Sequence, residues 1–185
     1  IRRDLWEKLG GFDEKLFMYY EDTDLSWQAR LAGYESLYTP ASIVHHDYRP
    51  AQAGFNTLYY SKRNRLILLL KAWRWPSLLL LAPSLLLAEA LDWAHALLIG
   101  RLGLRAKLRA SLWLLARLPA VLQARRQAQK ERAAPDLALL ESCVDAVAPV
   151  EFTAGRVGQV AMAACNLLLG LNYRLARSAC RRLRL

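Results

Sequence analysis

The hydrophobic and polar positions of residues 1–50 follow two different periods. Apolar residues recur on one helical face over residues 2–9 and again over residues 22–32, which predicts two short helices, each followed by a glycine. Residues 34–38 and 42–46 alternate with a period of two, and a proline separates them. That alternation predicts two short strands. The front of the chain therefore reads as a mixture of helix and strand.

From residue 55 onward the apolar positions recur at helical spacing. Helices are expected over residues 55–75, 101–132, 136–147 and 156–184. Pro76 interrupts the first of these. Residues 76–100 are the most apolar part of the chain, but their charge-free run is shorter than the roughly 20 residues that a membrane span needs. A buried helix pair and a re-entrant or membrane-surface hairpin both fit this segment.

The net charge of the chain is +10, and it is unevenly distributed. Residues 1–50 carry six Lys and Arg against nine Asp and Glu, whereas residues 51–185 carry twenty against seven. Long basic side chains beside leucine faces suit an anionic lipid surface. Nucleic-acid binding needs aromatic stacking platforms and fewer leucines, so no nucleic acid partner is expected. The three cysteines are widely spaced and show no metal-site pattern.

Acidic residues gather in the segment GGFDEKLFMYYEDTD, residues 10–24. Glu21, Asp22 and Asp24 fall within one helical turn, and packed carboxylates repel each other unless a cation, a proton or a catalytic task compensates. A solvated helix start explains the same charges, because the helix dipole favours acids there. In that interpretation Asp22 or Thr23 caps the helix. The charges alone leave both interpretations open.

The order of motifs in the first part of the chain resembles one enzyme family. GGFDE is followed by the aromatic run, EDTDL, an arginine and AGY, and then by YTP, His46 and KRNRL. This order is similar to the acceptor-side segment of inverting family 2 glycosyltransferases, the rhamnosyltransferase-like group of bacterial polysaccharide and cell-wall enzymes. The likeness covers about residues 1–75.

The resemblance implies an α/β fold. Residues 1–75 would form the C-terminal, acceptor-side half of a GT-A catalytic domain, and residues 76–185 a mostly α-helical, amphipathic and membrane-associated region. The chain begins with Ile1, so a longer protein is expected. Its other half would carry the nucleotide-binding acids and the D-x-D metal motif.

The resemblance also implies an activity, in which a sugar, with rhamnose as a candidate, moves with inversion from a nucleotide-diphosphate donor to a lipid-linked or polysaccharide acceptor of the bacterial cell envelope. A sugar hydroxyl is a poor nucleophile near neutral pH, so a carboxylate must accept its proton. The resemblance gives this role to Asp22, and Glu21 either assists it or is itself the base. A divalent cation, Mg or Mn, would neutralise the leaving diphosphate, with His46 as the implied metal ligand.

The resemblance implies six further contacts with acceptor or donor: Gly10, Gly11, Asp24, Trp27, Arg30 and Arg63. For Asp24, a structural role at the helix start or beside Arg30 is favoured over a catalytic one. With the basic helices, the resemblance implies a location at the cytoplasmic face of the bacterial inner membrane, peripheral or partly inserted. The alternative hypothesis is a non-catalytic, membrane-associated structural or assembly module, in which the helices carry the function.

Overall fold

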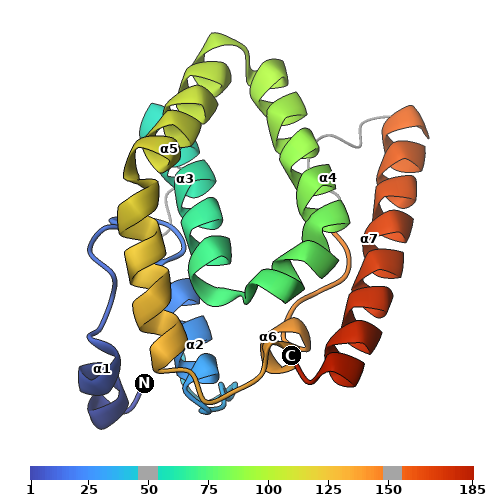
Figure 1. Cartoon of the computed structure of the whole chain (residues 1–185). Helices are drawn as coiled ribbons and strands as arrows, with labels where there is room; N and C mark the ends of the chain where they lie inside the picture. The colour runs from blue at the N-terminus through green and yellow to red at the C-terminus, as the bar shows by residue number, and fades with distance from the viewer. Residues whose placement is uncertain (46–53, 148–155) are drawn as a thin grey trace. The chain divides into compact units, whose positions relative to one another are not determined.

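The computed structural model describes residues 1–45, 54–147 and 156–185, and all regular elements in them are α-helices (Figure 1). In chain order these are α1 (Arg3–Leu9), α2 (Glu21–Leu31), α3 (Phe55–Ala72), α4 (Trp75–Ile99), α5 (Arg101–Lys130), α6 (Asp136–Leu140) and α7 (Arg156–Leu183). They form two compact units. Ile1–Ala72 joins His95–Ala134 in the first, and Trp73–Ala94 joins Pro135–Leu185 in the second. Whether residues 1–75 and 76–185 act as separate functional domains stays a prediction.

The predicted α/β fold is wrong for the described residues, because none of them forms a β-strand. Residues 34–45 include most of the two predicted strands, yet their backbone is irregular. Their apolar side chains are exposed, as at Tyr38 and Val44. A strand needs a neighbouring strand to pair its N–H and C=O groups, and the described residues offer none. Strand-forming side chains were therefore not sufficient to make a sheet.

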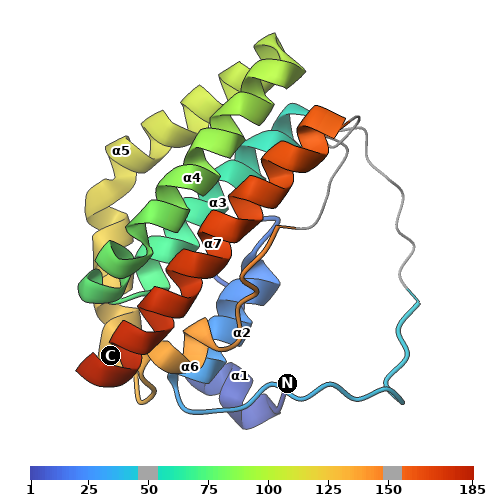
Figure 2. The same cartoon turned by 90° about the vertical axis from the view of Figure 1, so that its right-hand side faces the viewer.

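The core of the first unit lies between α3 and α5, which run side by side (Figures 1 and 2). Leu58 and Tyr59 of α3 pack against Ala106 and Ala110 of α5. The two alanines are four residues apart, so they share one face of α5 and let the aromatic side of α3 approach closely. A second cluster of buried residues contains Leu16, Ile67 and Val121. Through Leu16, the loop before α2 becomes part of this core.

The helix boundaries follow local chemistry, with two corrections. The predicted end of α1 at Gly10 is confirmed, since Gly10 has a left-handed φ of 77°. The predicted cap of α2 at Asp22 or Thr23 is wrong: Tyr20 occupies the N-cap position, also in the left-handed region, without a side-chain cap. The break near Pro76 is confirmed but falls earlier, between Ala72 and Trp75. Pro76 lies in the first turn of α4, where a helix needs no N–H donor.

In the second unit, α6 packs against α7 near the C-terminal end of α7 (Figure 2). Glu141, just after α6, accepts hydrogen bonds from Arg177 at 2.8 Å and Arg181 at 2.9 Å. The short helix predicted over residues 136–147 is shorter than expected and ends at Leu140. The predicted helix over residues 156–184 is confirmed by α7 to within one residue at its C-terminal end.

Pro83 does not divide α4, so residues 76–100 form neither a helix pair nor a hairpin but one continuous helix. A proline inside a helix loses one backbone hydrogen bond and crowds the preceding turn. Asn172 of α7 supports α4 at this point. It donates to the Leu80 carbonyl oxygen at 3.0 Å and accepts from the Ser84 hydroxyl at 2.6 Å. The carbonyl that loses its helical donor at Pro83 is that of Leu79, so Asn172 contacts the carbonyl next to it in the same turn of α4.

Within the described residues, α4 is also the one helix long and apolar enough to cross a membrane, by length and composition. Only 6% of its most apolar window is buried. Its C-terminal half carries Glu89, Asp92 and His95, which are costly in a bilayer interior. Association of α4 with a membrane is compatible with these facts, and the side of the membrane is not defined by them.

Candidate functional site

Lys71 of α3 lies at the centre of a charge cluster in the first unit. Its Nζ is 2.8 Å from Asp24 Oδ2 in α2 and 3.0 Å from Asp13 Oδ2 in the loop after α1. Gln28 donates to the same Asp24 oxygen at 2.6 Å. Lys71 and Asp24 are buried, and Asp13 is half-buried. We call Asp13, Asp24 and Lys71 the buried triad; it connects three segments that are distant in sequence.

Within the buried triad, the pKa values of Asp13 and Lys71 are shifted in the directions that favour their charged forms. Burial raises the pKa of Asp13, but the charge and hydrogen bond of Lys71 and the N–H of Lys15 outweigh burial and hold that pKa below its ordinary value. Burial likewise lowers the pKa of Lys71, but the charges and hydrogen bonds of Asp24 and then Asp13 raise it overall. Each charge therefore depends on the others being present.

The loop before α2, residues 16–20 with sequence LFMYY, has an unusual backbone; we call it the aromatic loop. Phe17, Tyr19 and Tyr20 have φ values of 64°, 64° and 70°, in the left-handed region. This region costs a residue with a β-carbon about 1–2 kcal/mol. Hydrogen bonds from Arg63 and Asn64 of α3 reach the backbone carbonyls of this loop. The chain is thus held in a conformation that its side chains disfavour.

The candidate acids come directly after the aromatic loop, in the first turn of α2. Asp22 is exposed, and its Oδ1 accepts from the Thr23 N–H at 2.7 Å and from the Thr23 hydroxyl at 3.2 Å. The other carboxylate oxygen, Oδ2, takes no part in these two bonds. Glu21 is half-buried, and its Oε2 is buried without a hydrogen-bond partner in the described part of the chain. The two acids therefore differ in environment: one is solvated, and the other has a poorly solvated oxygen.

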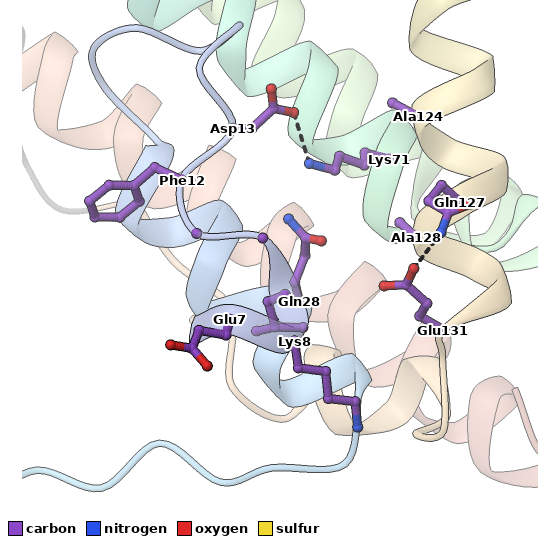
Figure 3. Close-up of a pocket in the computed structure, with 13 residues that line it drawn as sticks. Glu7, Lys8, Phe12, Asp13, Gln28, Lys71, Ala124, Gln127, Ala128 and Glu131 are labelled. Carbon is purple, nitrogen blue, oxygen red and sulfur yellow. Dashed lines mark hydrogen bonds and ion pairs between the residues drawn. The ribbon is translucent and has the colours of Figure 1, made fainter. Parts of the chain in front are cut away.

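A cavity of about 380 Å³ lies between the end of α1, the GGFD turn and α5 (Figure 3). Gly10 and Gly11 line it together with Asp13 and Lys71. In Figure 3 the Asp13–Lys71 ion pair stands on one wall, and Gln127 and Glu131 of α5 are paired on the other. Glu21 and Asp22 do not line the cavity. The predicted site residues are therefore divided between the cavity and the start of α2.

The two glycines of the cavity wall respond differently to substitution. Both have left-handed φ values, but a β-carbon on Gly11 would lie 2.8 Å from Trp6 Cζ2, whereas one on Gly10 meets nothing within 4 Å. We expect Gly10→Ala to lower the free energy of unfolding by about 1 kcal/mol and Gly11→Ala by about 2–3 kcal/mol. Urea denaturation of both variants measures the difference. Equal losses would show that Trp6 moves aside freely.

The remaining predicted contact residues lie in two settings. Trp27 and Arg30 are half-buried on α2. Arg63 is buried, and its guanidinium lies 4.7 Å from the Tyr60 ring centre and 4.6 Å from that of Trp113. Whether any of the three contacts a ligand stays a prediction.

Asp24 is paired differently from the expectation. Arg30 was the predicted partner, but the observed one is Lys71. Residues six apart on a helix do not share a face, so Asp24 and Arg30 of α2 point in different directions. With 2% of its surface exposed, Asp24 serves the packing of α2 on α3. A contact of Asp24 with acceptor or donor is untested.

The described residues contain no group of three or more His, Cys, Asp and Glu side chains that could hold a metal ion. His46 lies outside the described residues, so the role implied for it stays a prediction. Carboxylates are present in the buried triad, but Lys71 already neutralises them. The described part of the chain does not fit a metal site of its own.

Sequence reasoning placed the acids but missed the residues that hold them. Asn64 belongs to the KRNRL element, and Lys71 follows that element five residues later. Asp13 belongs to GGFDE. The two motifs indicated that this part of the chain carries functional residues. They did not reveal that Asp13 and Lys71, 58 positions apart, form an ion pair. Such a pairing depends on how α3 packs against the loop.

Comparison with known proteins gives one short match. The chain is similar to N-acetylglucosaminyl-diphospho-decaprenol L-rhamnosyltransferase of Mycobacterium tuberculosis, in the strains CDC 1551 / Oshkosh and ATCC 25618 / H37Rv. In each case 47% of 47 residues are identical, over 25% of this chain and 15% of the relative. No protein-family model matches the chain, and no solved structure matches it significantly. The match supports a glycosyltransferase-like relationship over a short stretch.

Proposed function

We propose that this chain is part of a glycosyltransferase that moves rhamnose from a nucleotide-diphosphate donor to a lipid-linked N-acetylglucosamine in bacterial cell-envelope synthesis. The observation that carries the proposal is the stretch of 47 residues, 47% identical to a rhamnosyltransferase whose name states this acceptor. The chain spans 15% of the length of that relative. Donor binding is therefore assigned to other parts of the longer protein.

The start of α2 supports a chemical role for Asp22. An acceptor hydroxyl attacks the anomeric carbon of the donor, the bond from that carbon to the diphosphate oxygen breaks, and the hydroxyl proton passes to a carboxylate. Asp22 is exposed and has one oxygen outside its bonds to Thr23, so it can receive this proton. Attack from the face opposite the diphosphate inverts the anomeric centre. Glu21 is the neighbouring alternative base.

A membrane surface is the proposed location of the acceptor. One face of α7 carries exposed apolar side chains: Val160, Leu167, Leu168, Leu171 and Leu175. Exposed arginines at the end of the same helix include Arg174 and Arg182. An apolar face beside cationic side chains favours the surface of an anionic bilayer, where a lipid-linked sugar is presented. The exposed surface of α4 adds a second apolar helix.

Leu171→Gln tests this membrane contact. Because burial of a leucine side chain is worth about 1.5–3 kcal/mol, we expect roughly tenfold or greater weakening of binding to vesicles that contain phosphatidylglycerol. The matched control is Leu37→Gln, which changes an exposed leucine in the irregular segment after α2 and is expected to leave binding unchanged. Sedimentation with vesicles measures both. Equal binding of the two variants would contradict a role for α7.

The experiment that tests the function is a transfer assay with the full-length protein, nucleotide-diphosphate sugars and polyprenyl-diphosphate-linked N-acetylglucosamine, with Mg or Mn added. Formation of a disaccharide-lipid from the rhamnose donor supports the proposal. Vesicle binding without transfer of any sugar would favour the non-catalytic membrane module instead.

A further inference from the structure

Asn64 is the most enclosed polar residue in contact with the aromatic loop. It is fully buried in α3, with 0% of its surface exposed. Its Nδ2 lies 2.8 Å from each of three backbone carbonyl oxygens, those of Leu16, Met18 and Tyr19. An amide nitrogen has two hydrogens, so one of them is shared between two carbonyls. A single side chain thus fixes the path of nearly the whole loop.

Arg63 sets the orientation of the Asn64 amide. Its Nε donates to Asn64 Oδ1 at 2.8 Å, so the amide oxygen is occupied and the NH₂ group faces the loop. The Arg63 Nη2 donates at 2.6 Å to the Lys15 carbonyl and at 3.1 Å to that of Leu16. The guanidinium is enclosed by aromatic rings, including Trp113 of α5. Arg63 and Asn64 therefore act on the loop as one connected unit.

This unit determines where α2 begins. Tyr20, the last residue of the aromatic loop, is the N-cap of α2, and its carbonyl accepts the Asp24 N–H at 2.8 Å. Glu21 and Asp22 follow within the same turn. Seven residues after Asn64, on the same face of α3, Lys71 holds Asp24. The first turn of α2 is consequently fixed to α3 through the loop before it and through the buried triad.

We propose that Asn64, oriented by Arg63, is a positioning residue for the candidate acids. It holds the aromatic loop in its left-handed conformation and so fixes the direction in which Glu21 and Asp22 leave α2. Asn64 is buried and does not face the acceptor; it acts through the loop. This inference rests on the proposed function, because it concerns the placement of the proposed base.

Asn64→Asp in the full-length protein tests the proposal. The substitution keeps the shape and the acceptor for Arg63, but it removes the NH₂ donors and sets a carboxylate oxygen against three carbonyls. We expect kcat to fall roughly 10- to 100-fold with little change in the KM for the donor. Hydrogen exchange of the amides of residues 16–22 should become faster in the same variant.

The matched control is Gln129→Glu. Gln129 of α5 also donates its amide to backbone carbonyls of α3, those of Lys71 and Ala72, but it does not contact the aromatic loop. This variant carries the same amide-to-acid change and is expected to keep kcat and loop exchange near those of the wild type. Arg63→Lys, which removes the Nε contact to Asn64, is the second variant and should show the Asn64→Asp pattern more weakly.

Unchanged exchange of residues 16–22 in Asn64→Asp would overturn the proposal, and so would normal kcat in a variant whose loop exchanges faster. Failure of the proposed function has a different signature. The wild-type full-length protein would then transfer no sugar, while the exchange data would still show whether Asn64 holds the loop.

Discussion

Asp22→Asn in the full-length protein is expected to lower the rate of sugar transfer by roughly 10²- to 10⁴-fold, because an amide cannot accept the proton of the acceptor hydroxyl. Binding of the nucleotide sugar should persist, since Asp22 is not proposed to contact the donor nucleotide. Single-turnover transfer and equilibrium binding of the donor, measured on the same preparation, separate the two effects.

Two further variants make this result specific. Glu14→Gln changes another exposed carboxylate of the same segment and is expected to leave transfer unchanged. Glu21→Gln tests the neighbouring acid. A greater loss in Glu21→Gln than in Asp22→Asn would move the role of base to Glu21. Normal turnover in Asp22→Asn together with an inactive Glu21→Gln would also assign the role of base to Glu21.

Lys71→Met is expected to have the largest effect on stability, lowering the free energy of unfolding by about 3–5 kcal/mol. It leaves Asp24 buried and Asp13 half-buried without their cation. The control is Lys130→Met on α5, where the lysine is exposed and the expected change is within about 0.5 kcal/mol. Adding Asp24→Leu to Lys71→Met should recover part of the loss, because it removes one of the unpaired charges. Urea denaturation measures all three.

The contribution of the buried triad depends on pH in a defined direction. The pKa of Asp13 is lowered, so its stabilisation is complete above its ordinary value of 3.8 and disappears as the pH falls through the folded-state pKa. The pKa of Lys71 is raised, so its stabilisation is complete below its ordinary value of 10.5 and is lost as the pH rises further. Between these values the contribution of the Asp13 and Lys71 charges to the free energy of unfolding of the wild type should be nearly constant. A strong change in this contribution near neutral pH would contradict the pKa directions given for Asp13 and Lys71.

The order of the sequence motifs and the observed contacts explain each other in part. The resemblance joined GGFDE, EDTDL and KRNRL as one ordered set, without a physical reason for their association. In the structure, Asp13 of the first element and Asp24 of the second both contact Lys71, just after the third. Asn64 of the third element holds the loop that leads into the second. The motifs belong together because their residues build one packed unit around the candidate acids.

Features with a short-range cause were predictable. Gly10 ends α1 because a residue without a β-carbon adopts the left-handed conformation readily, and that property is visible in a single letter. The apolar repeat of α7 gave its extent within one residue at the C-terminal end. The cluster of Glu21, Asp22 and Asp24 was also visible, together with the two competing explanations for it.

Other features depended on partners that local sequence does not specify. Residues 34–45 have strand-forming side chains but no partner strand among the described residues, so the prediction of a sheet was wrong. Residues 76–100 were compatible with a helix pair or a hairpin, yet α4 continues through Pro83, where Asn172 of α7 contacts it. Each outcome was decided by a contact with a distant segment, whereas a pattern of letters records only which contacts a segment is able to make.

The sequence by itself determined that acids gather before and within the first turn of α2, and that KRNRL lies on a helix further along. Tertiary packing decided which of those acids are used in the fold. It buried Asp24 against Lys71 and left Asp22 exposed two residues earlier, because α3 approaches one side of α2 and not the other. A charge that is enclosed must have a fixed partner, whereas one that remains exposed is available for proton transfer.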